Sequence, residues 1–297
     1  MPYVRVGAID LYYEAHGSGP RVVVIVHGAL GSVAFADRFG LQASALAARG
    51  LRVIAYDARG HGRSGYSTAA KDYDKTALAG ELLGLLDALD VRCASLCGTS
   101  MGATSALLVA QAHPERVDRL VLRSPPPFGA DMIPVRRALA ALALSYQVLG
   151  VTLTARLATL RPGAGGGHRM HTLLRGQRRA SVVPVLRGFP AEPLDIEGLQ
   201  TVTSPALVLT QPADALHPLR SGDVLHEQMP NADLCVAPTP TFWHDCAADT
   251  LDVIAAFVDG RDGFTARFAA ARGCTFVARR AGRELLTRTS ATPAPGR

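Results

Sequence analysis

The sequence Cys97-Gly98-Thr99-Ser100-Met101-Gly102 joins two elements of different periodicity through a serine between glycines. The apolar run from Ala94 to Cys97 predicts a buried strand, and the stretch from Ala103 to Ala112 predicts a helix. A strand that reverses directly into a helix places the residue at the bend in a strained, exposed conformation. Ser100 is therefore a candidate nucleophile, and the N–H of Met101, at the helix N-terminus, is a candidate oxyanion donor.

Strand and helix patterns alternate along most of the chain. Apolar runs that predict buried strands cover residues 22–26, 52–56, 94–97, 120–122, 206–210 and 234–237. Helical patterns cover residues 41–49, 76–89, 102–112 and 251–258. This alternation predicts an α/β fold with an open parallel sheet between helices. The alternating segment 3–13, which is followed by Gly17-Ser18-Gly19-Pro20, predicts an antiparallel hairpin at the N-terminus.

Residues 125–204 interrupt the alternation. They begin with Pro125-Pro126-Pro127, read as helix and loop, and are too long for a simple connection. We expect a core formed by 1–124 and 205–259, with 125–204 as an inserted helical cap over the carboxyl edge of the sheet, where α/β proteins bind ligands. Residues 260–297 are expected to form a basic C-terminal extension that is partly disordered.

One uncharged stretch of the cap, Ala138 to Ala155, is long enough to cross a membrane. Because polar residues interrupt it and it lies between two halves of an α/β pattern, we predict a buried or lid helix instead. Its apolar side chains predict either an acyl pocket or packing within the lid: Leu139, Leu142, Leu144, Val148, Leu149, Val151 and Leu153. The segment 162–167, with four glycines, predicts a hinge or mobile loop.

Composition limits the class of protein. The 297 residues, 48% of them hydrophobic, fit one catalytic domain with a large core. Five widely spaced cysteines without a C-x-x-C motif argue against a disulfide framework or a zinc site. The first 20 residues lack the apolar region of a signal peptide. We therefore expect a cytoplasmic protein.

The charge pattern bears on partners. Eight arginines and two acidic residues in 260–297 account for the net charge of +6. Such a tail could contact nucleic acid, an anionic membrane or an acidic protein, but a solvated end is the simpler interpretation. We expect a small-molecule substrate as the partner, and neither nucleic acid nor a membrane.

Serine chemistry also needs a second oxyanion donor, an orienting acid and a base, and each has a candidate after a predicted strand. In His27-Gly28-Ala29-Leu30, the N–H of Ala29 is the candidate donor. Asp214 lies four residues beyond the strand that ends at Thr210, and it could hold a histidine in position. His244 follows the last predicted strand and is the candidate base.

Two other histidines are given structural roles. His217 belongs to His217-Pro218 and is interpreted as part of a turn, not as a base. His61 lies in a turn-rich loop in which Asp57 and Arg59 are expected to hold the chain together.

These motifs resemble those of the α/β-hydrolase superfamily, in the branch with a serine nucleophile. The matching residues are His27-Gly28, the D-x-R-G-H-G-x-S motif of 57–64, and Gly98-Thr99-Ser100-Met101-Gly102. The resemblance covers about residues 1–259 and is weakest over 125–204. It implies a mostly parallel eight-stranded sheet flanked by helices, with an inserted helical cap.

The resemblance also implies the site. Ser100, Asp214 and His244 match the family's triad, and the amides of Ala29 and Met101 match its oxyanion hole. The chain departs from the family in Gln211-Pro212, where a glycine-bearing turn is usual, and in Trp243, where a small residue is common. Leu30 and Trp243 are expected to contact the substrate.

We therefore expect a serine hydrolase that needs neither a metal nor an organic cofactor. It would cleave a carboxylic ester or related acyl bond of a small apolar substrate through an acyl-serine. A serine in place of an aspartate nucleophile disfavours haloalkane and epoxide hydrolysis. Hydrolysis of a C–C bond in a β-diketone-type substrate or of a lactone could use the same triad, and a perhydrolase side activity is conceivable. A non-hydrolytic protein that binds a ligand or promotes cyclisation is a third alternative, and the oligomeric state stays open.

Overall fold

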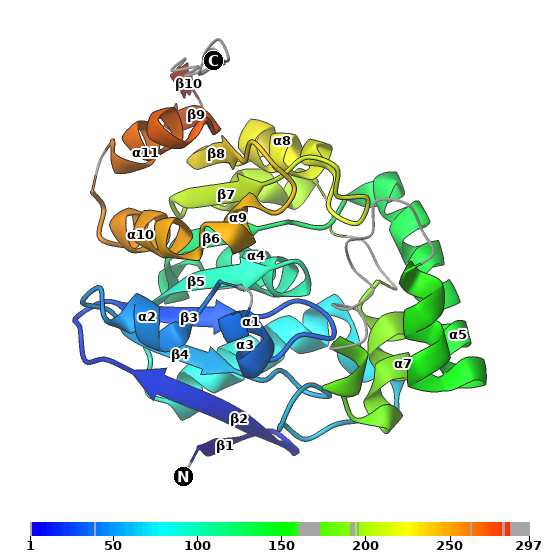
Figure 1. Ribbon diagram of the computed structural model, residues 1–297. Coiled ribbons are helices and arrows are strands. Elements are labelled where there is room, and N and C mark those ends of the chain that lie inside the picture. The colour runs from blue at the N-terminus through cyan, green and yellow to red at the C-terminus, as the bar shows by residue number, and fades with distance from the viewer. Residues whose placement is uncertain are drawn as a thin grey trace.

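A ten-stranded sheet forms the centre of the computed structural model, which describes residues 2–38, 40–159, 173–190, 194, 196–261, 263–280 and 283–285 (Figure 1). The strand order among these residues is β1-β2-β4-β3-β5-β6-β7-β8-β9-β10. The six strands from β4 to β8 in this order are parallel, and the pairs at both ends are antiparallel. The strands are β1 (Tyr3–Val6), β2 (Ile9–His16), β3 (Val22–Val26), β4 (Arg52–Tyr56), β5 (Ala94–Thr99), β6 (Val117–Arg123), β7 (Ala206–Thr210), β8 (Ala232–Val236), β9 (Thr275–Arg280) and β10 (Arg283–Leu285).

Helices cover both faces of the sheet, as expected where parallel strands are joined by crossovers (Figure 1). One apolar core packs side chains of α3, α4 and α8 against the sheet, and a second packs those of α1, α2, α10 and α11 against the other face. The helices are α1 (Val33–Arg38), α2 (Ala43–Ala47), α3 (Lys75–Ala88), α4 (Met101–Ala112), α5 (Met132–Thr159), α7 (Arg179–Gly188), α8 (Leu219–Gln228), α9 (Phe242–Asp245), α10 (Ala247–Val258) and α11 (Phe264–Arg272).

The predicted central strands are confirmed by the structure. Four of the five residues of β3 are buried, and β3 pairs in parallel with β4 on one side and β5 on the other. A β-branched run of this kind suits a strand that is covered on both faces. The predicted N-terminal hairpin is also present, as β1 and β2.

The C-terminal residues extend the sheet, which differs from the expectation of a solvated end. After α10 the chain forms α11, and β9 then pairs antiparallel with β8. Phe268 and Phe276 from this segment are buried in the second core. Burial of these aromatic side chains stabilises the added strands, so the sheet exceeds the expected eight strands. Residues 286–297 lie outside the described residues.

The chain between β6 and β7 forms α5 and α7, which lie together at the end of the sheet where the parallel strands terminate (Figure 1). A third cluster of buried residues includes Tyr146, Val182 and Leu186 and joins α5 to α7. At Gly150 the backbone leaves the helical region (φ 68°, ψ −176°), so α5 is kinked there. The expected hinge at 162–167 lies outside the described residues, and the domain boundaries stay a prediction.

The stretch interpreted as a buried or lid helix is a largely exposed helix in the structure. By length and composition, residues Gly129–Thr154 could cross a membrane, and 17% of the apolar window is buried. Full burial is therefore wrong for this helix, and its role as a lid stays a prediction.

Candidate active site

The turn from β5 to α4 gives Ser100 the strained backbone that its sequence predicts, and the residue is half-buried and lines the cleft. Ser100 has φ 52° and ψ −115°, a conformation that non-glycine residues rarely adopt. A hydrogen bond of 3.0 Å from its N–H to the carbonyl of Arg123 in β6 fixes this backbone. The flanking glycines are required by close backbone contacts. A Cβ on Gly98 would lie 2.4 Å from the Gly102 carbonyl oxygen, and one on Gly102 would lie 2.1 Å from that of Val26.

A chain of hydrogen bonds connects Ser100 to His217 and Asp214. Nδ1 of His217 lies 2.9 Å from Oδ2 of Asp214, and Nε2 of His217 lies 2.9 Å from Oγ of Ser100. Because a carboxylate only accepts, Nδ1 carries the proton and Nε2 is left to accept the hydroxyl proton of Ser100. A serine, a histidine and a carboxylate in this order are the components of an activated nucleophile.

Asp214 is held by donors from its own loop. Its Oδ1 accepts the N–H groups of Leu216 and His217, at 3.0 and 3.1 Å, and its Oδ2 accepts Nε2 of Gln211 at 2.8 Å. Burial acts to raise the pKa of Asp214, but the hydrogen bonds and charge interaction with His217, together with the other donors, outweigh it and leave the pKa below its usual value. The carboxyl group is therefore ionised at neutral pH.

The structure corrects the interpretation of His217 as a turn residue, and it does not place His244 in this chain of hydrogen bonds. Nδ1 of His244 lies 2.7 Å from Oδ1 of the adjacent Asp245. Both residues belong to α9, which starts at Phe242 and sets the direction of these side chains. His244 still lines the same cleft as Ser100 and Asp214. The predicted convergence of the three regions is thus present, but the imidazole between serine and carboxylate comes from a different loop.

The two predicted oxyanion amides flank Ser100. Met101 is the first residue of α4, so its N–H has no carbonyl one helical turn before it to bond. On the other side, a Cβ on Gly28 would lie 3.2 Å from Cβ of Ser100, which shows how closely the loop of Ala29 approaches the nucleophile. The next amide, the N–H of Leu30, donates a hydrogen bond of 3.1 Å to Nε2 of His61. This bond fixes the backbone beside Ala29.

Two buried histidines lock the loops that follow β3 and β4. Nε2 of His27 accepts the N–H of Ala58 at 3.0 Å, and its Nδ1 lies 2.8 Å from the Gly28 carbonyl oxygen. In His61, Nδ1 donates to the Arg59 carbonyl at 2.8 Å. Burial lowers the pKa of His27, and burial together with the nearby His27 lowers the pKa of His61 to about 3. Both rings are therefore neutral and hold the two loops in place through hydrogen bonds, consistent with the structural role predicted for His61.

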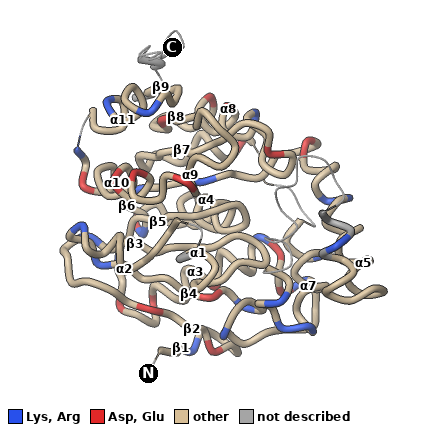
Figure 2. The backbone as a smooth tube through the Cα atoms, viewed as in Figure 1, with Lys and Arg blue, Asp and Glu red and all other residues tan. Residues whose placement is uncertain are grey.

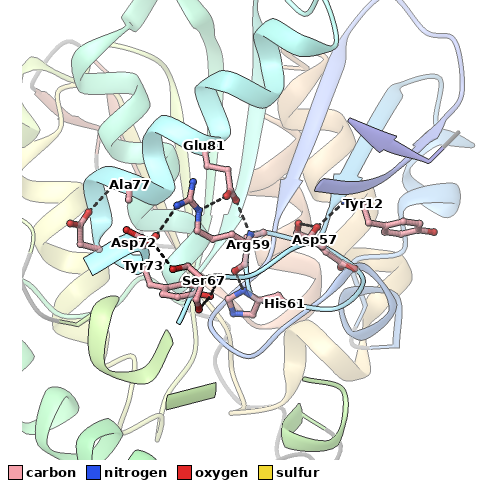
Figure 3. A network of polar contacts seen from close by, with 12 residues as sticks. Tyr12, Asp57, Arg59, His61, Ser67, Asp72, Tyr73, Ala77 and Glu81 are labelled. Carbon is pink, nitrogen blue, oxygen red and sulfur yellow. Dashed lines mark hydrogen bonds and ion pairs between the residues drawn. The ribbon is translucent and has the colours of Figure 1, made fainter. Parts of the chain in front are cut away.

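Asp57 and Arg59 hold the second loop together, as predicted from the sequence (Figure 3). Asp57 accepts the N–H groups of Val33 and Arg63, at 2.7 and 2.8 Å. Nε of Arg59 lies 2.7 Å from Oε2 of Glu81, whose side chain is fully buried in α3. Burial raises the pKa of Glu81, and the contacts with Arg59 oppose this shift. A buried pair of this kind makes removal of either partner costly.

The cleft above Ser100 is an apolar cavity of about 350 Å³. The sheet side contributes Leu30 and Trp243, the two residues expected to contact the substrate. The cap side contributes Val135, Leu139, Leu142, Leu173, Leu186 and Phe189. Of the apolar residues proposed for an acyl pocket, Leu139 and Leu142 line the cavity, whereas Leu144, Val148, Leu149 and Leu153 are exposed.

The cap is tied to the loop of Ala29. Nε2 of Gln177 donates to the carbonyl oxygens of Leu30, at 2.7 Å, and of Gly31, at 3.3 Å. Oγ of Ser181 donates to the carbonyl of Gly60. These bonds hold α7 and the segment before it over the cleft. Within the described part of the chain, no group of three or more His, Cys, Asp or Glu residues is arranged to hold a metal ion.

Sequence reasoning missed His217 and the role of Gln211. The signal for His217 was its place three residues after Asp214 in the loop after β7, where a single turn can bring both side chains to the same edge. From the sequence, Gln211 is recognised only as a departure from the family's glycine-bearing turn. In the structure its amide contacts both Asp214 and Oγ of Ser124, so the departure supplies a donor to the carboxylate.

Comparisons with known proteins agree with this architecture. Residues 21–160 match the family defined by the α/β hydrolase fold. A candidate carbamate hydrolase, RutD of Caulobacter sp. (strain K31), is 31% identical over 252 residues, which cover 78% of this chain and 89% of the relative. A 2-hydroxy-6-oxononadienedioate/2-hydroxy-6-oxononatrienedioate hydrolase of Burkholderia vietnamiensis (strain G4 / LMG 22486) is 29% identical over 240 residues, which cover 77% of this chain and 83% of the relative.

Solved structures share the fold at lower identity. The enol-lactonase from Burkholderia xenovorans LB400 has a TM-score of 0.73 and 20% identity, covering 87% of this chain and 100% of that chain. An esterase from Exiguobacterium antarcticum has a TM-score of 0.71 and 20% identity, covering 86% of this chain and 98% of that chain. With the relative that is 31% identical over most of both chains, these findings show that the protein belongs to the α/β-hydrolase fold family.

Proposed function

We propose that the protein hydrolyses carboxylic esters of small apolar acids, with Ser100 as nucleophile, His217 as general base and Asp214 as the residue that orients it. The observation that carries this proposal is the unbroken path from Oγ of Ser100 through His217 to Asp214, with 2.9 Å at each step. The order of donor and acceptor along it is the one that transfers the serine proton to the imidazole.

The reaction follows from this geometry. His217 takes the proton of Ser100 as Oγ attacks the ester carbonyl, and the negative oxygen forms beside the N–H groups of Ala29 and Met101. His217 then gives the proton to the departing alcohol, which leaves an acyl group on Oγ of Ser100. Water, deprotonated by the same imidazole, attacks the acyl group and restores the free serine. The ionised Asp214 stabilises the imidazolium formed in each half of the reaction.

The shape of the cleft supports the substrate class. A cavity of about 350 Å³ is within the range of small-molecule sites, and leucine, valine and aromatic side chains dominate its cap side. Such walls favour an acyl chain over a charged or sugar-like group, because burial of polar groups without partners is unfavourable.

Ester turnover by chain length tests the proposal. We expect purified protein to react with a fluorophosphonate probe and to hydrolyse p-nitrophenyl esters with an optimum at short to medium acyl chains. Ser100→Ala should abolish labelling and reduce turnover by several orders of magnitude. Absence of both labelling and turnover in folded wild-type protein would contradict the proposal and favour a ligand-binding role.

A second candidate is cleavage of a C–C bond or a lactone ring by the same residues. It is favoured by the name of a relative, a 2-hydroxy-6-oxononadienedioate/2-hydroxy-6-oxononatrienedioate hydrolase with 29% identity over most of both chains. Labelling of Ser100 without ester turnover would support this candidate. A panel of lactones and vinylogous diketones would then separate the two reactions.

A further inference from the structure

The outer face of α5 carries large apolar side chains that are exposed. Val148 is 70% exposed and Leu144 is 58% exposed, and Ile133, Leu149 and Leu153 are also among the exposed large hydrophobic residues. Leu144 and Val148 are four residues apart and therefore lie on one side of the helix. On the opposite side, Ala143 and Tyr146 are buried against the rest of the cap. The outer face is thus an apolar ridge of the kind that marks an interaction surface.

The charges around this ridge have one sign. Between Asp131 and Glu192 the sequence contains nine arginines and neither aspartate nor glutamate. Arg136 and Arg137 are exposed near the start of α5, and Arg178, Arg179 and Arg187 are exposed at and within α7. Figure 2 shows this basic colouring along α5 and α7. The cap is therefore a cationic surface on a protein whose remaining charges include both signs.

One contact places Arg187 at the border of the ridge. Nη2 of Arg187 lies 3.4 Å from Oε1 of Gln147, the neighbour of Val148. Arg179 lies near Tyr146, on the buried side of α5, where it acts to lower the pKa of the Tyr146 hydroxyl against the larger effect of burial. Among the described residues, no salt bridge joins Arg136, Arg137 or Arg187 to an acidic side chain. Their charge is available to an external anion.

We propose that the cap docks on an anionic lipid bilayer through the apolar ridge of α5. A helix that lies in the interface places apolar side chains below the headgroups and arginines among them, and each cation near an anionic surface adds to binding. The ridge and its arginine border supply both parts. The proposal does not depend on the reaction at Ser100, and it differs from the sequence-based expectation that a membrane is not a partner.

A second copy of the chain fits this surface less well. Two ridges in contact would bring two arginine borders together, with no acidic residue in 132–191 to offset them, and like charges oppose such a contact. An anionic bilayer meets the same surface with the opposite charge. The position of α5 adds a consequence for the cleft. Leu139 and Leu142 line the cavity from the same helix, so docking would bring the cavity next to the lipid surface.

Vesicle flotation tests the proposal. We expect full-length protein to float with vesicles of phosphatidylglycerol and phosphatidylcholine in equal parts, and to remain in solution with phosphatidylcholine alone. Leu144→Gln with Val148→Gln should lower the partition coefficient about tenfold or more, and so should Arg136→Gln with Arg137→Gln at low salt. Ile196→Gln is the matched control, since Ile196 is an exposed apolar residue between α7 and β7, and it should float as wild type does.

The variants remain interpretable because none of the substituted residues lines the cleft. Turnover of a soluble p-nitrophenyl ester and the thermal unfolding curve should match wild type, which shows that a loss of flotation comes from the surface. Equal flotation by wild type and both double variants would overturn the proposal, as would no flotation of wild type on anionic vesicles at low salt. A concentration-dependent dimer that Leu144→Gln with Val148→Gln dissociates, without vesicle binding, would assign the ridge to self-association instead.

Discussion

Replacement of His217 and of His244 by alanine distinguishes the two histidines of the cleft. His217→Ala removes the acceptor 2.9 Å from Oγ of Ser100 and the group that protonates the leaving alcohol. Because the three residues of the triad act as a unit and His217 is its general base, we expect kcat to fall about 10⁴-fold. This loss corresponds to about 5 kcal/mol of transition-state stabilisation.

The expected effect of His244→Ala is far smaller. The His244 side chain is 33% exposed and its partner Asp245 is 57% exposed, so their contact is a surface ion pair at most. Pairs of this kind contribute about 0–1 kcal/mol to stability, so its loss should leave the fold intact. Because His244 is not part of the chain of hydrogen bonds from Ser100 to Asp214, we expect kcat to change by roughly fivefold at most. A change in KM is compatible with this expectation, because His244 lines the cleft.

Steady-state hydrolysis of a p-nitrophenyl ester gives kcat and KM for both variants, and circular dichroism verifies that each is folded. Added imidazole should restore part of the activity of His217→Ala and leave His244→Ala unchanged. The assignment of His217 as the base is wrong if His217→Ala keeps kcat within tenfold of wild type while His244→Ala loses a factor of a thousand or more. That outcome would make His244, the base predicted from the sequence, the working base.

Three further changes have expected outcomes. Gly102→Ala should lower the free energy of unfolding by several kcal/mol in urea titrations, because its Cβ would lie 2.1 Å from a backbone oxygen of β3. The control is Gly80→Ala, whose Cβ would lie in open space within α3. This control variant should raise the free energy of unfolding by about 0.5–1 kcal/mol. Gln211→Leu removes the 2.8 Å bond to the triad carboxylate, so kcat should fall roughly tenfold with little change in KM. Stability measured by urea should decrease as the pH falls from 6.5 towards 3, because burial depresses the pKa values of His27 and His61 and the unfolded chain therefore binds more protons in this window.

For each of these three predictions, one outcome would contradict it. A stable Gly102→Ala variant would mean that α4 can move away from β3 at low cost. A Gln211→Leu variant with unchanged kcat would show that the loop amides alone suffice to hold the carboxylate. Each neutral buried histidine should change the free energy of unfolding by about 1.4 kcal/mol per pH unit between pH 6.5 and its depressed pKa. A free energy of unfolding that stays constant over this range would contradict the burial of these rings in the neutral form.

The sheet could be predicted from the sequence because its signal is local. The apolar runs at 22–26, 52–56 and 206–210 coincide with β3, β4 and β7, since a short, largely apolar run is compatible with few structures other than a strand covered on both faces. The strands β9 and β10 lay beyond this reasoning. Their sequence is rich in arginine. β9 pairs with β8, β10 pairs with β9, and Phe276 of β9 is buried in a core built by distant residues.

The apolar character of α5 was also evident in the sequence, but its orientation was not. Periodicity shows that a helix is apolar, whereas only packing shows which side meets the rest of the protein. Leu142 faces the cavity and Leu144 faces solvent, although both have the same side chain and lie two residues apart. Two residues along a helix correspond to a rotation of about 200°, which is enough to separate a pocket wall from an interaction surface.

For the site, local sequence is enough to place Ser100, because a strand, a glycine-flanked serine and a helix encode the bend without reference to the rest of the chain. The strand pattern also places Asp214 at the carboxyl edge. Which histidine lies between them depends on how distant loops pack around the site. The loop after β7 turns within three residues and directs His217 towards Ser100, while α9 directs His244 towards Asp245. Side-chain direction over a separation of 117 residues depends on how loops pack, and no periodic pattern in the sequence records it.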